Sequence, residues 1–293
     1  MAEVQISAGK KFREALRRGT VAIPGVFNAL TARMAEELGF RAVYQSGAAL
    51  SAGLAALPDV GLITQTEFAT QGEYLARAVS IPVISDADTG FGEALSVERT
   101  VREYERAGLA GLHLEDQQLP KRCGHLSGKE LVTTGEMVSK IKAAVGARVD
   151  PEFVIIARTD ARAGEGFQEA VDRALAYVDA GADMIFPEAL QTVEEFGLFA
   201  EKVKVPLLAN MTEFGKSPLL SVDELNELGY AAVLFPVTIF RVAMKAAEEA
   251  LKTILEEGTQ KSFVERMQTR AQLYELLRYK GYEERDQSYF GSR

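Results

Sequence analysis

The only cysteine of this 293-residue chain lies in a short polar segment, Lys121-Arg122-Cys123-Gly124-His125. Cationic neighbours lower the pKa of a thiol from its reference value of about 8.5 and keep the side chain solvated. A lone cysteine is usually a small core residue, but this segment has few apolar neighbours. We therefore interpret Cys123 as a candidate for proton transfer, with His125 either orienting the segment or binding a carboxylate.

Two aspartates one residue apart form a second group. Asp86 and Asp88 come where an apolar run gives way to a glycine-rich turn, and Glu115 ends another apolar run. Clusters of carboxylate oxygens suit Mg²⁺ or Mn²⁺, which keep several waters and use few protein ligands. We predict that Asp86 and Asp88 bind Mg²⁺, with Mn²⁺ as the alternative, and that Glu115 holds a ligand water. Capping aspartates in a solvated turn would be the structural alternative.

A divalent ion at this place could chelate an α-hydroxy or α-keto carboxylate, and the guanidinium of Arg158 could then bind another carboxylate of the substrate. Arg241 and Arg270 are further candidates for this role, although both fall in helical sequence. Metal polarisation favours an enolate or cleavage of the adjacent carbon–carbon bond. The carbanion left behind needs a proton, so we interpret Cys123 as a general acid rather than a nucleophile.

Eight short apolar runs recur along the chain, and segments of helical periodicity separate them. Continuous apolar runs of this length are typical of parallel strands buried on both faces. Eight such units predict a (β/α)8 barrel, with a doubly wound open sheet as the alternative. The runs are residues 21–25, 42–45, 83–86, 111–115, 153–157, 184–187, 207–210 and 232–235.

Polar residues follow most of these runs at the same place, the carboxyl end of the strand. A barrel gathers those ends at one rim, where its active sites lie. The long polar connection 117–134, which carries Cys123, is expected to cover this rim as a lid. The residues at the strand ends are Ser46, Gly47, Asp86, Asp88, Glu115, Asp116, Arg158, Asp160, Glu188 and Asn210.

We predict a barrel with an N-terminal helix over residues 1–258 and a helical extension over 259–293. A single helix is expected from Thr259 to Arg278, with a stripe formed by Val264, Met267, Ala271 and Tyr274. This stripe is expected to pack on the barrel or on a neighbouring subunit.

Composition limits the partners. A net charge of −9 and a pI near 5.1 argue against nucleic acid or an anionic membrane as the main partner. The apolar stretches fall short of the roughly 18 residues that a membrane span needs, and the first twenty residues contain no signal-peptide core. One cysteine allows no intrachain disulfide, so we expect a reducing, cytoplasmic location.

From Val21 to Arg278 the chain resembles the isocitrate lyase and phosphoenolpyruvate mutase superfamily. The lyase branch of that superfamily carries a signature of Lys, then Lys or Arg, then Cys-Gly-His, which corresponds to residues 121–125 and follows Glu115-Asp116-Gln117 here. Further matching motifs are Tyr44-Gln45-Ser46-Gly47-Ala48, residues 86–92, residues 157–161, Phe186-Pro187-Glu188-Ala189 and residues 208–212.

The resemblance implies Mg²⁺-dependent cleavage of 2-methylisocitrate to pyruvate and succinate, in the methylcitrate route of propionate breakdown. It also implies a homotetramer of (β/α)8 barrels that exchange their last helix. Cys123 would be the acid and Tyr44 would stabilise the intermediate, with His125 and Arg158 as further catalytic candidates. The implied substrate-binding residues are Ser46, Gly47, Ala48, Gly124, Arg158, Glu188, Asn210, Met211, Thr212, Arg241 and Arg270.

Related substrates remain open at this point: isocitrate, 2,3-dimethylmalate or a citramalate-like acid. One methyl group in an apolar pocket changes binding by only about 1–3 kcal/mol, and residues 126–129 resemble the lids of dimethylmalate-type lyases. The apolar residues Phe186, Leu234 and Pro236 near the rim favour a methylated substrate. A non-catalytic barrel that binds a dicarboxylate is a more remote alternative, and it would not need the thiol.

Overall fold

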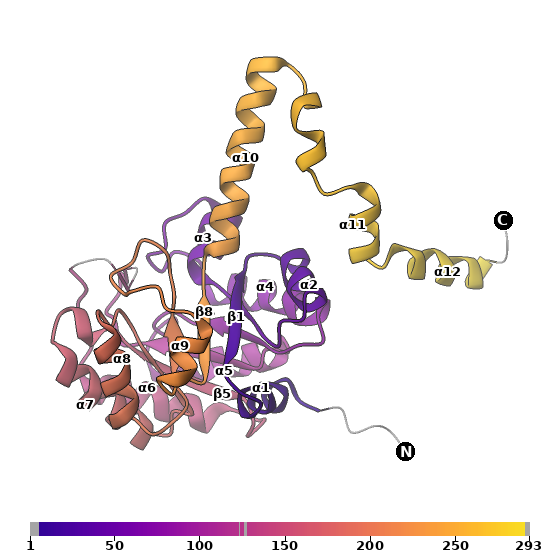
Figure 1. Ribbon diagram of the computed structural model, residues 1–293. Coiled ribbons are helices and arrows are strands. Elements are labelled where there is room, and N and C mark those ends of the chain that lie inside the picture. Colours follow the sequence, from indigo (N-terminus) through magenta and orange to yellow (C-terminus); the bar gives the residue numbers. More distant parts are fainter. Residues whose placement is uncertain (1–5, 123, 126–127, 291–293) are drawn as a thin grey trace. The chain divides into compact units, whose positions relative to one another are not determined.

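A computed structural model describes residues 6–122, 124–125 and 128–290, in which strands and helices alternate (Figure 1). The strands are β1 (Val21–Val26), β2 (Val43–Gln45), β3 (Val83–Asp86), β4 (Gly111–Glu115), β5 (Val154–Thr159), β6 (Met184–Pro187), β7 (Leu208–Asn210) and β8 (Ala232–Phe235). The α-helices are α1 (Ala8–Arg17), α2 (Ala29–Glu37), α3 (Gly47–Ala55), α4 (Gln65–Ala78), α5 (Ala94–Arg106), α6 (Thr134–Ala147), α7 (Phe167–Asp179), α8 (Val193–Lys202), α9 (Val222–Glu227), α10 (Thr238–Glu257), α11 (Arg270–Leu276) and α12 (Tyr279–Phe290). Two 3₁₀ turns, η1 (Ala161–Ala163) and η2 (Lys261–Arg266), complete the description.

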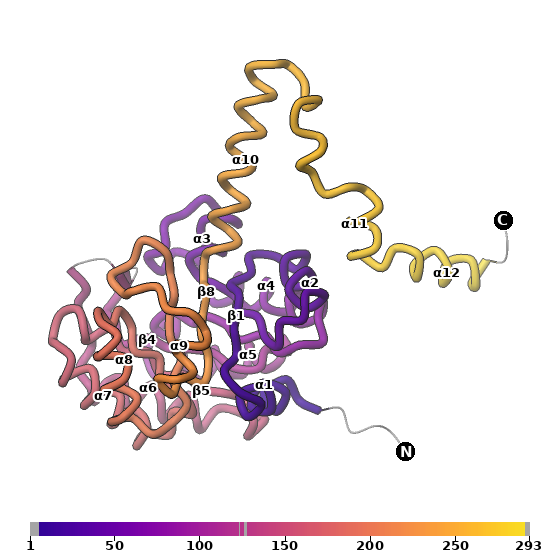
Figure 2. The backbone as a smooth tube through the Cα atoms, in the orientation of Figure 1, coloured from indigo at the N-terminus to yellow at the C-terminus, as the bar shows by residue number. Residues whose placement is uncertain are grey.

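The strands form one parallel sheet in the order β6-β5-β4-β3-β2-β1-β8-β7. The first strand pairs with both β2 and β8, so the beginning and the end of the barrel are neighbours. A bridge between Ile185 of β6 and Leu207, directly before β7, joins the two edges of the sheet. Figure 2 traces this path of the backbone. The predicted (β/α)8 barrel is confirmed, and the open doubly wound sheet is excluded.

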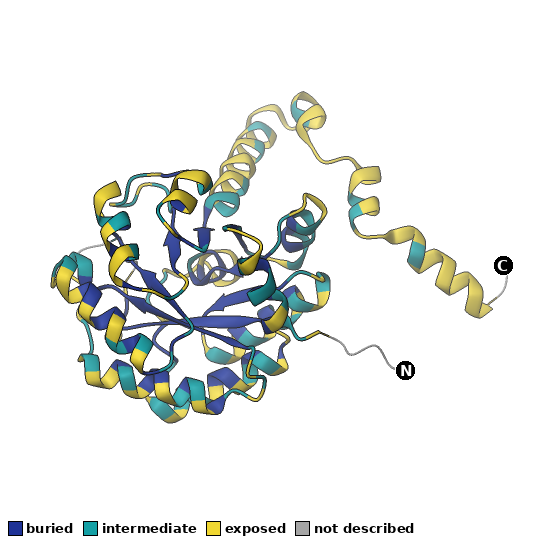
Figure 3. Ribbon diagram, turned by 60° about the horizontal axis from the view of Figure 1, so that its bottom comes forward, coloured by how far each residue is buried: buried dark blue, intermediate teal, exposed yellow. Residues whose placement is uncertain are grey.

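The strands are buried on both faces, as their continuous apolar runs predict (Figure 3). Successive side chains of a strand point to opposite faces. Ile84 and Ile156 therefore belong to a cluster inside the barrel, while Leu112 and Ile155 pack outward against the helices. The helix α1 contributes the fully buried Phe12 to the interior cluster.

Local sequence sets where several helices begin. The side chains of Thr64, Thr133 and Ser221 each accept a hydrogen bond from the backbone N–H of the glutamate three residues on. The side chain of that glutamate in turn accepts a hydrogen bond from the backbone N–H of the Thr or Ser. This reciprocal arrangement satisfies two backbone groups that would otherwise lack partners. The outer helices therefore start at fixed positions after the loops that leave the rim.

The chain divides into two compact units, Met1–Phe240 and Arg241–Arg293. The stretch from Thr238 to Glu257, which the alternating pattern predicts as the eighth helix, forms α10. No helix within the described ranges is long and apolar enough to cross a membrane. The prediction of one helix over 259–278 is wrong. Met267 is extended and Thr269 caps a new helix, so η2 and α11 are separate, and α12 follows them. The domain boundary at 258 stays a prediction.

We expect Gly25→Ala to destabilise the barrel by about 2–3 kcal/mol, the usual effect of forcing an extra methyl into a packed site. A Cβ at Gly25 would overlap the backbone carbonyl of Pro236, which cannot move without breaking the pairing of β1 with β8. Urea unfolding measures the change. The control is Gly146→Ala in α6, where no atom lies within 4 Å of the added methyl. Equal stability of the two variants would contradict this packing.

Candidate active site

Polar side chains meet where the barrel strands end. Asp86 and Glu115 are the last residues of β3 and β4, Arg158 lies next to the end of β5, and Asn210 ends β7. Glu188 follows β6 directly. All five are 9% exposed or less. The parallel strands thus place these charges at one rim, shielded from solvent.

The two predicted metal ligands lie side by side. The turn after β3 gives Asp88 a positive φ of 47°, and its N–H donates to Asp86 Oδ1 at 2.9 Å. Burial alone would raise the pKa of the Asp86 carboxyl, but His113, Lys121 and this N–H hold it at about 2. Burial lowers the pKa of His113 itself to about 4, so the ring carries charge only below that pH. At pH 7 the charges of Lys121 and Arg158 stabilise ionised Asp86.

Burial, together with the negative charges of Asp86 and Asp59, raises the pKa of Asp88 to about 7, although the charge of Lys121 opposes this shift. The ammonium of Lys121 lies 2.5 Å from oxygens of both Asp88 and Asp59. Sequence reasoning missed Asp59, because it follows α3 rather than a strand end and no position in the strand pattern marks it. The aspartate in the Pro58-Asp59 turn was its only signal.

Lys121 corrects an expectation about the cysteine segment. Lys121 is 2% exposed and His125 has a side-chain exposure of 7%, so neither keeps the segment solvated. The side chains of both residues contact buried carboxylates: Lys121 contacts Asp59 and Asp88, and His125 contacts Glu188. Cys123 itself lies outside the described residues, and so do Leu126 and Ser127.

Buried carboxylate oxygens near the aspartates lack hydrogen-bond donors among the described residues, which is rare in folded proteins and typical of a cation-binding site. Neither oxygen of Glu115 has a hydrogen-bond partner there, and the Arg158 guanidinium approaches one of them only to 3.4 Å. Within the described residues no three His, Cys, Asp or Glu side chains converge on one point. The oxygens of Asp86, Asp88 and Glu115 would suit a hard cation such as Mg²⁺, which keeps several waters and so needs few protein ligands.

Arg158 is the centre of the second half of the rim. Asp160 accepts two hydrogen bonds from the Arg158 guanidinium, at 2.9 and 3.1 Å, and Arg158 Nε lies 3.8 Å from Glu188 Oε2. The guanidinium also stacks over the ring of Phe186, 5.1 Å from its centroid. Burial would lower the pKa of Arg158, but these carboxylates raise it, so the cation is permanent.

Glu188 connects the strand ends to the signature loop. Asn210 donates to both of its oxygens at 3.2 Å, and His125 Nε2 lies 2.7 Å from Oε1. Burial would raise the pKa of Glu188, but Arg158 and His125 lower it, so the carboxylate stays ionised. The other ring nitrogen of His125 accepts from the Lys216 N–H at 2.9 Å. His125 therefore joins the loop to two different strand ends.

Gly124 must be a glycine in this arrangement, because a Cβ there would overlap the guanidinium of Arg158 and the side chain of Glu188. The side chain of Gln117 bonds both the N–H and the carbonyl of Arg122, at 2.9 and 2.8 Å. The described residues on both sides of Cys123 are thus held at the rim.

The phenol of Tyr44 lies 3.2 Å from Asp86 Oδ2 and 2.7 Å from His113 Nε2. Burial and Asp86 raise the pKa of Tyr44, so the hydroxyl keeps its proton and acts as a donor. A Cβ at Gly47 would overlap Asp86, while Ser46 caps α3 through Ala49.

The other predicted substrate residues are less clearly placed at the rim. The sulfur of Met211 accepts from the Leu220 N–H, which is a structural contact. Ala48 and Thr212 are half-buried, in α3 and after β7. Arg241 and Arg270 belong to the second unit, so their roles stay predictions.

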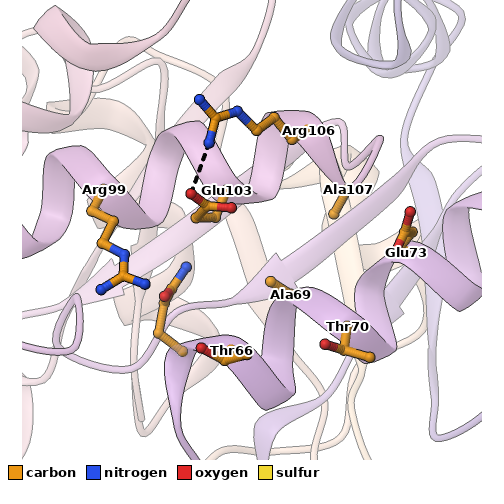
Figure 4. Close-up of a pocket in the computed structure, with 9 residues that line it drawn as sticks. Thr66, Ala69, Thr70, Glu73, Arg99, Glu103, Arg106 and Ala107 are labelled. Carbon is orange, nitrogen blue, oxygen red and sulfur yellow. Dashed lines mark hydrogen bonds and ion pairs between the residues drawn. The ribbon is translucent and has the colours of Figure 1, made fainter.

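A groove of about 290 Å³ lies away from these groups, between α4 and α5 (Figure 4). Its lining includes Arg99, Glu103 and Thr70, and Arg106 is paired with Glu103 at 2.9 Å. None of the rim carboxylates lines it. The groove is therefore not the reaction site.

The buried carboxyl group of Asp116 holds the residues at the end of β5 in place through hydrogen bonds. Its oxygens accept from the Thr159 hydroxyl at 2.8 Å, the Asp160 N–H at 2.9 Å and the Tyr177 hydroxyl at 2.8 Å. The residue is fully buried. Because Asp160 in turn holds Arg158, the orientation of that guanidinium depends on this buried carboxylate.

The sequence matches the family profile described as phosphoenolpyruvate phosphomutase over residues 12–255. It is 57% identical over 270 residues to a 2-methylisocitrate lyase of Aeropyrum pernix, covering 92% of this chain and 87% of the relative. A solved 2,3-dimethylmalate lyase has a TM-score of 0.92 and 35% identity, covering 98% of this chain and 97% of that chain. A phosphonopyruvate hydrolase in complex with oxalate and Mg²⁺ has a TM-score of 0.86 and 33% identity, covering 95% and 98%.

We expect Tyr177→Phe to lower the free energy of unfolding by about 2 kcal/mol, because it removes a hydrogen bond to a buried charged group. The matched variant is Tyr104→Phe, which removes a buried hydrogen bond to the neutral carbonyl of Asp86 at 3.0 Å. That loss should cost only about 1 kcal/mol. Denaturant unfolding of both variants compares them, and a larger effect at Tyr104 would contradict the stronger hydrogen bond of Tyr177 to the Asp116 carboxyl group.

Proposed function

The chain belongs to the phosphoenolpyruvate phosphomutase family, within the superfamily that its signature motif indicates, and we propose that it cleaves 2-methylisocitrate to pyruvate and succinate. One observation carries this proposal. The signature residues Gly124 and His125 contact Arg158 and Glu188, on the same rim as the Asp86–Asp88 pair. The 57% identity to a 2-methylisocitrate lyase supports the choice of substrate over 2,3-dimethylmalate, whose lyase is 35% identical.

Charge balance supports a need for Mg²⁺. The rim cations Lys121, Lys129 and Arg158 face a larger number of carboxylates. A tricarboxylate would add further negative charge to a site with little water, which is costly without a compensating cation. These carboxylates are Asp59, Asp86, Asp88, Glu115, Asp160 and Glu188.

When bound, Mg²⁺ supplies Lewis-acid polarisation of the substrate hydroxyl and its neighbouring carboxylate. Arg158 and Asn210 bind the remaining carboxylates, and the Tyr44 hydroxyl donates to the oxygen that becomes the keto group of pyruvate. A carboxylate of the rim accepts the proton of the substrate hydroxyl, and the adjacent carbon–carbon bond breaks. The electron pair of the broken bond moves into the carboxylate attached to the carbon that leaves with the succinate part. The Cys123 thiol then gives a proton to this carbon, which yields succinate.

The remaining expectations form part of this proposal. The protein acts in the cytoplasm as a homotetramer, with a barrel over 1–258 and an exchanged extension over 259–293. Arg241, in the first range, and Arg270, in the second, bind substrate. In the second unit no described helical residue is buried, and Leu251 and Leu255 are 68% and 86% exposed. Such exposure suits a segment that is covered by another subunit.

We expect a panel of 2-hydroxy acids to separate the candidate substrates. Pyruvate should form from 2-methylisocitrate with a kcat/KM at least about tenfold above that for isocitrate, the effect of one methyl in an apolar pocket. EDTA should abolish the reaction and Mg²⁺ should restore it. The assay measures pyruvate and glyoxylate for 2-methylisocitrate, isocitrate, 2,3-dimethylmalate and citramalate. Equal efficiency with isocitrate, or no turnover of any acid, would reject the assignment.

We expect Cys123→Ser to lower kcat by about 10²–10⁴-fold, the range that a positioned proton donor contributes. Binding of succinate and Mg²⁺, measured by calorimetry, should persist because the described binding groups are unchanged. Glu130→Gln, an exposed residue of the same loop, is the control and should keep its activity. A serine variant with most of its turnover would refute the acid role.

A further inference from the structure

We propose that Lys129 is a positioning residue that fixes the backbone beside Cys123 to the carboxylate that orients Arg158. The inference rests on the proposed lyase function and adds a residue to it. Lys129 lies outside the signature motif, six residues after the cysteine.

The geometry of Lys129 links two parts of the site. Its ammonium donates to the carbonyl of Gly124 at 2.5 Å and to Asp160 Oδ1 at 2.6 Å. The side chains of Lys129 and Asp160 are 4% and 0% exposed. A lysine buried to this degree is rare unless it is paired, so its place is specific rather than a solvated surface contact.

The carboxylate of Asp160 accepts hydrogen bonds from both Lys129 and Arg158. The oxygen that binds Lys129 also accepts from Arg158 Nη2 at 3.1 Å, while the other oxygen accepts from Arg158 Nε at 2.9 Å. The backbone N–H of Asp160 is held by Asp116. One rigid carboxylate therefore sets the place of the guanidinium and, through Lys129, of the Gly124 carbonyl.

This connection matters for proton transfer because the donor must reach a carbon whose carboxylates are bound elsewhere on the rim. A misplacement of about 1 Å can cost about 10²-fold in rate. Gly124 has no side chain to anchor the loop, and it lies against Arg158 and Glu188. Lys129 supplies a charge-assisted anchor next to the cysteine without filling the space for substrate.

The test compares Lys129→Met with Glu130→Gln, the exposed neighbour. We expect Lys129→Met to lower kcat by about 10²-fold with a much smaller change in KM, since it disturbs the position of the acid more than substrate binding. Lys129→Gln keeps a donor without the charge and should lose less. If the methionine variant does not fold, the glutamine variant carries the comparison. Wild-type kcat in both variants would overturn the proposal.

A second readout separates positioning from a general loss of stability. The single cysteine allows its alkylation rate to be followed over a pH series in the ligand-free protein, where the plateau reports access and the midpoint reports the thiol pKa. Lys129→Met should raise the plateau about tenfold, as expected when one charge-assisted hydrogen bond of the loop is lost. An unchanged plateau would mean a merely structural role and would overturn the inference.

The two proposals fail in different ways. A wild-type protein without turnover of 2-methylisocitrate would reject the proposed function, whereas the alkylation plateau would still test Lys129. An active wild type with an unaltered Lys129→Met variant would reject Lys129 alone. In an Asp160→Asn background, Lys129→Met should cost little more kcat, because contacting residues are not additive. Full additivity would show that Lys129 does not act through Asp160.

Discussion

The buried negative charge at the carboxyl end of the barrel is the constraint from which the rest of the site follows. Carboxylates taken out of water are costly unless cations and hydrogen bonds compensate them. Strand ends alone supply mostly acids, with Arg158 as their cation. The other cations come from the loop that follows β4: the ammonium of Lys121 pairs with Asp88, and that of Lys129 pairs with Asp160. Among the described residues neither oxygen of Glu115 has a hydrogen-bond partner, and burial raises the pKa of this carboxyl.

The same ion pairs position the signature loop. Lys121 and Lys129 stand on either side of Cys123, and each bonds a carboxylate next to a different strand. His125 reaches a third strand end through Glu188. Electrostatic contacts thus hold the loop around Cys123, while Leu131 and Val132 near its end pack against the apolar core. This explains a polar sequence in a segment whose lysines and histidine are nevertheless buried.

Sequence patterns predict what is local or periodic. Apolar runs predict the eight strands, and the parallel barrel then requires their ends to meet, which is why Asp86 and Arg158 could be assigned to one rim. Pairings between distant loops follow no such period. Asp59 meets Lys121 across 62 positions of sequence, so neither its role nor the burial of Lys121 could be read from neighbours. The break at Met267 also escaped prediction, because the cap at Thr269 competes with an otherwise continuous helical stripe.

Fold and chemistry are separable in this protein. Barrels of closely similar shape belong to a 2,3-dimethylmalate lyase and to a phosphonopyruvate hydrolase, proteins named for different substrates. The scaffold therefore cannot select the reaction by itself. Strand-borne groups such as Asp86 and Arg158 are fixed by ladder hydrogen bonds and by Asp116 behind them. Loop-borne groups are fixed by side-chain contacts, such as those of Lys121 with Asp59 and Asp88. A change in the loop leaves the strand ladders intact, so under the proposed mechanism the loop is the part of the chain that can change the proton donor while the barrel is kept.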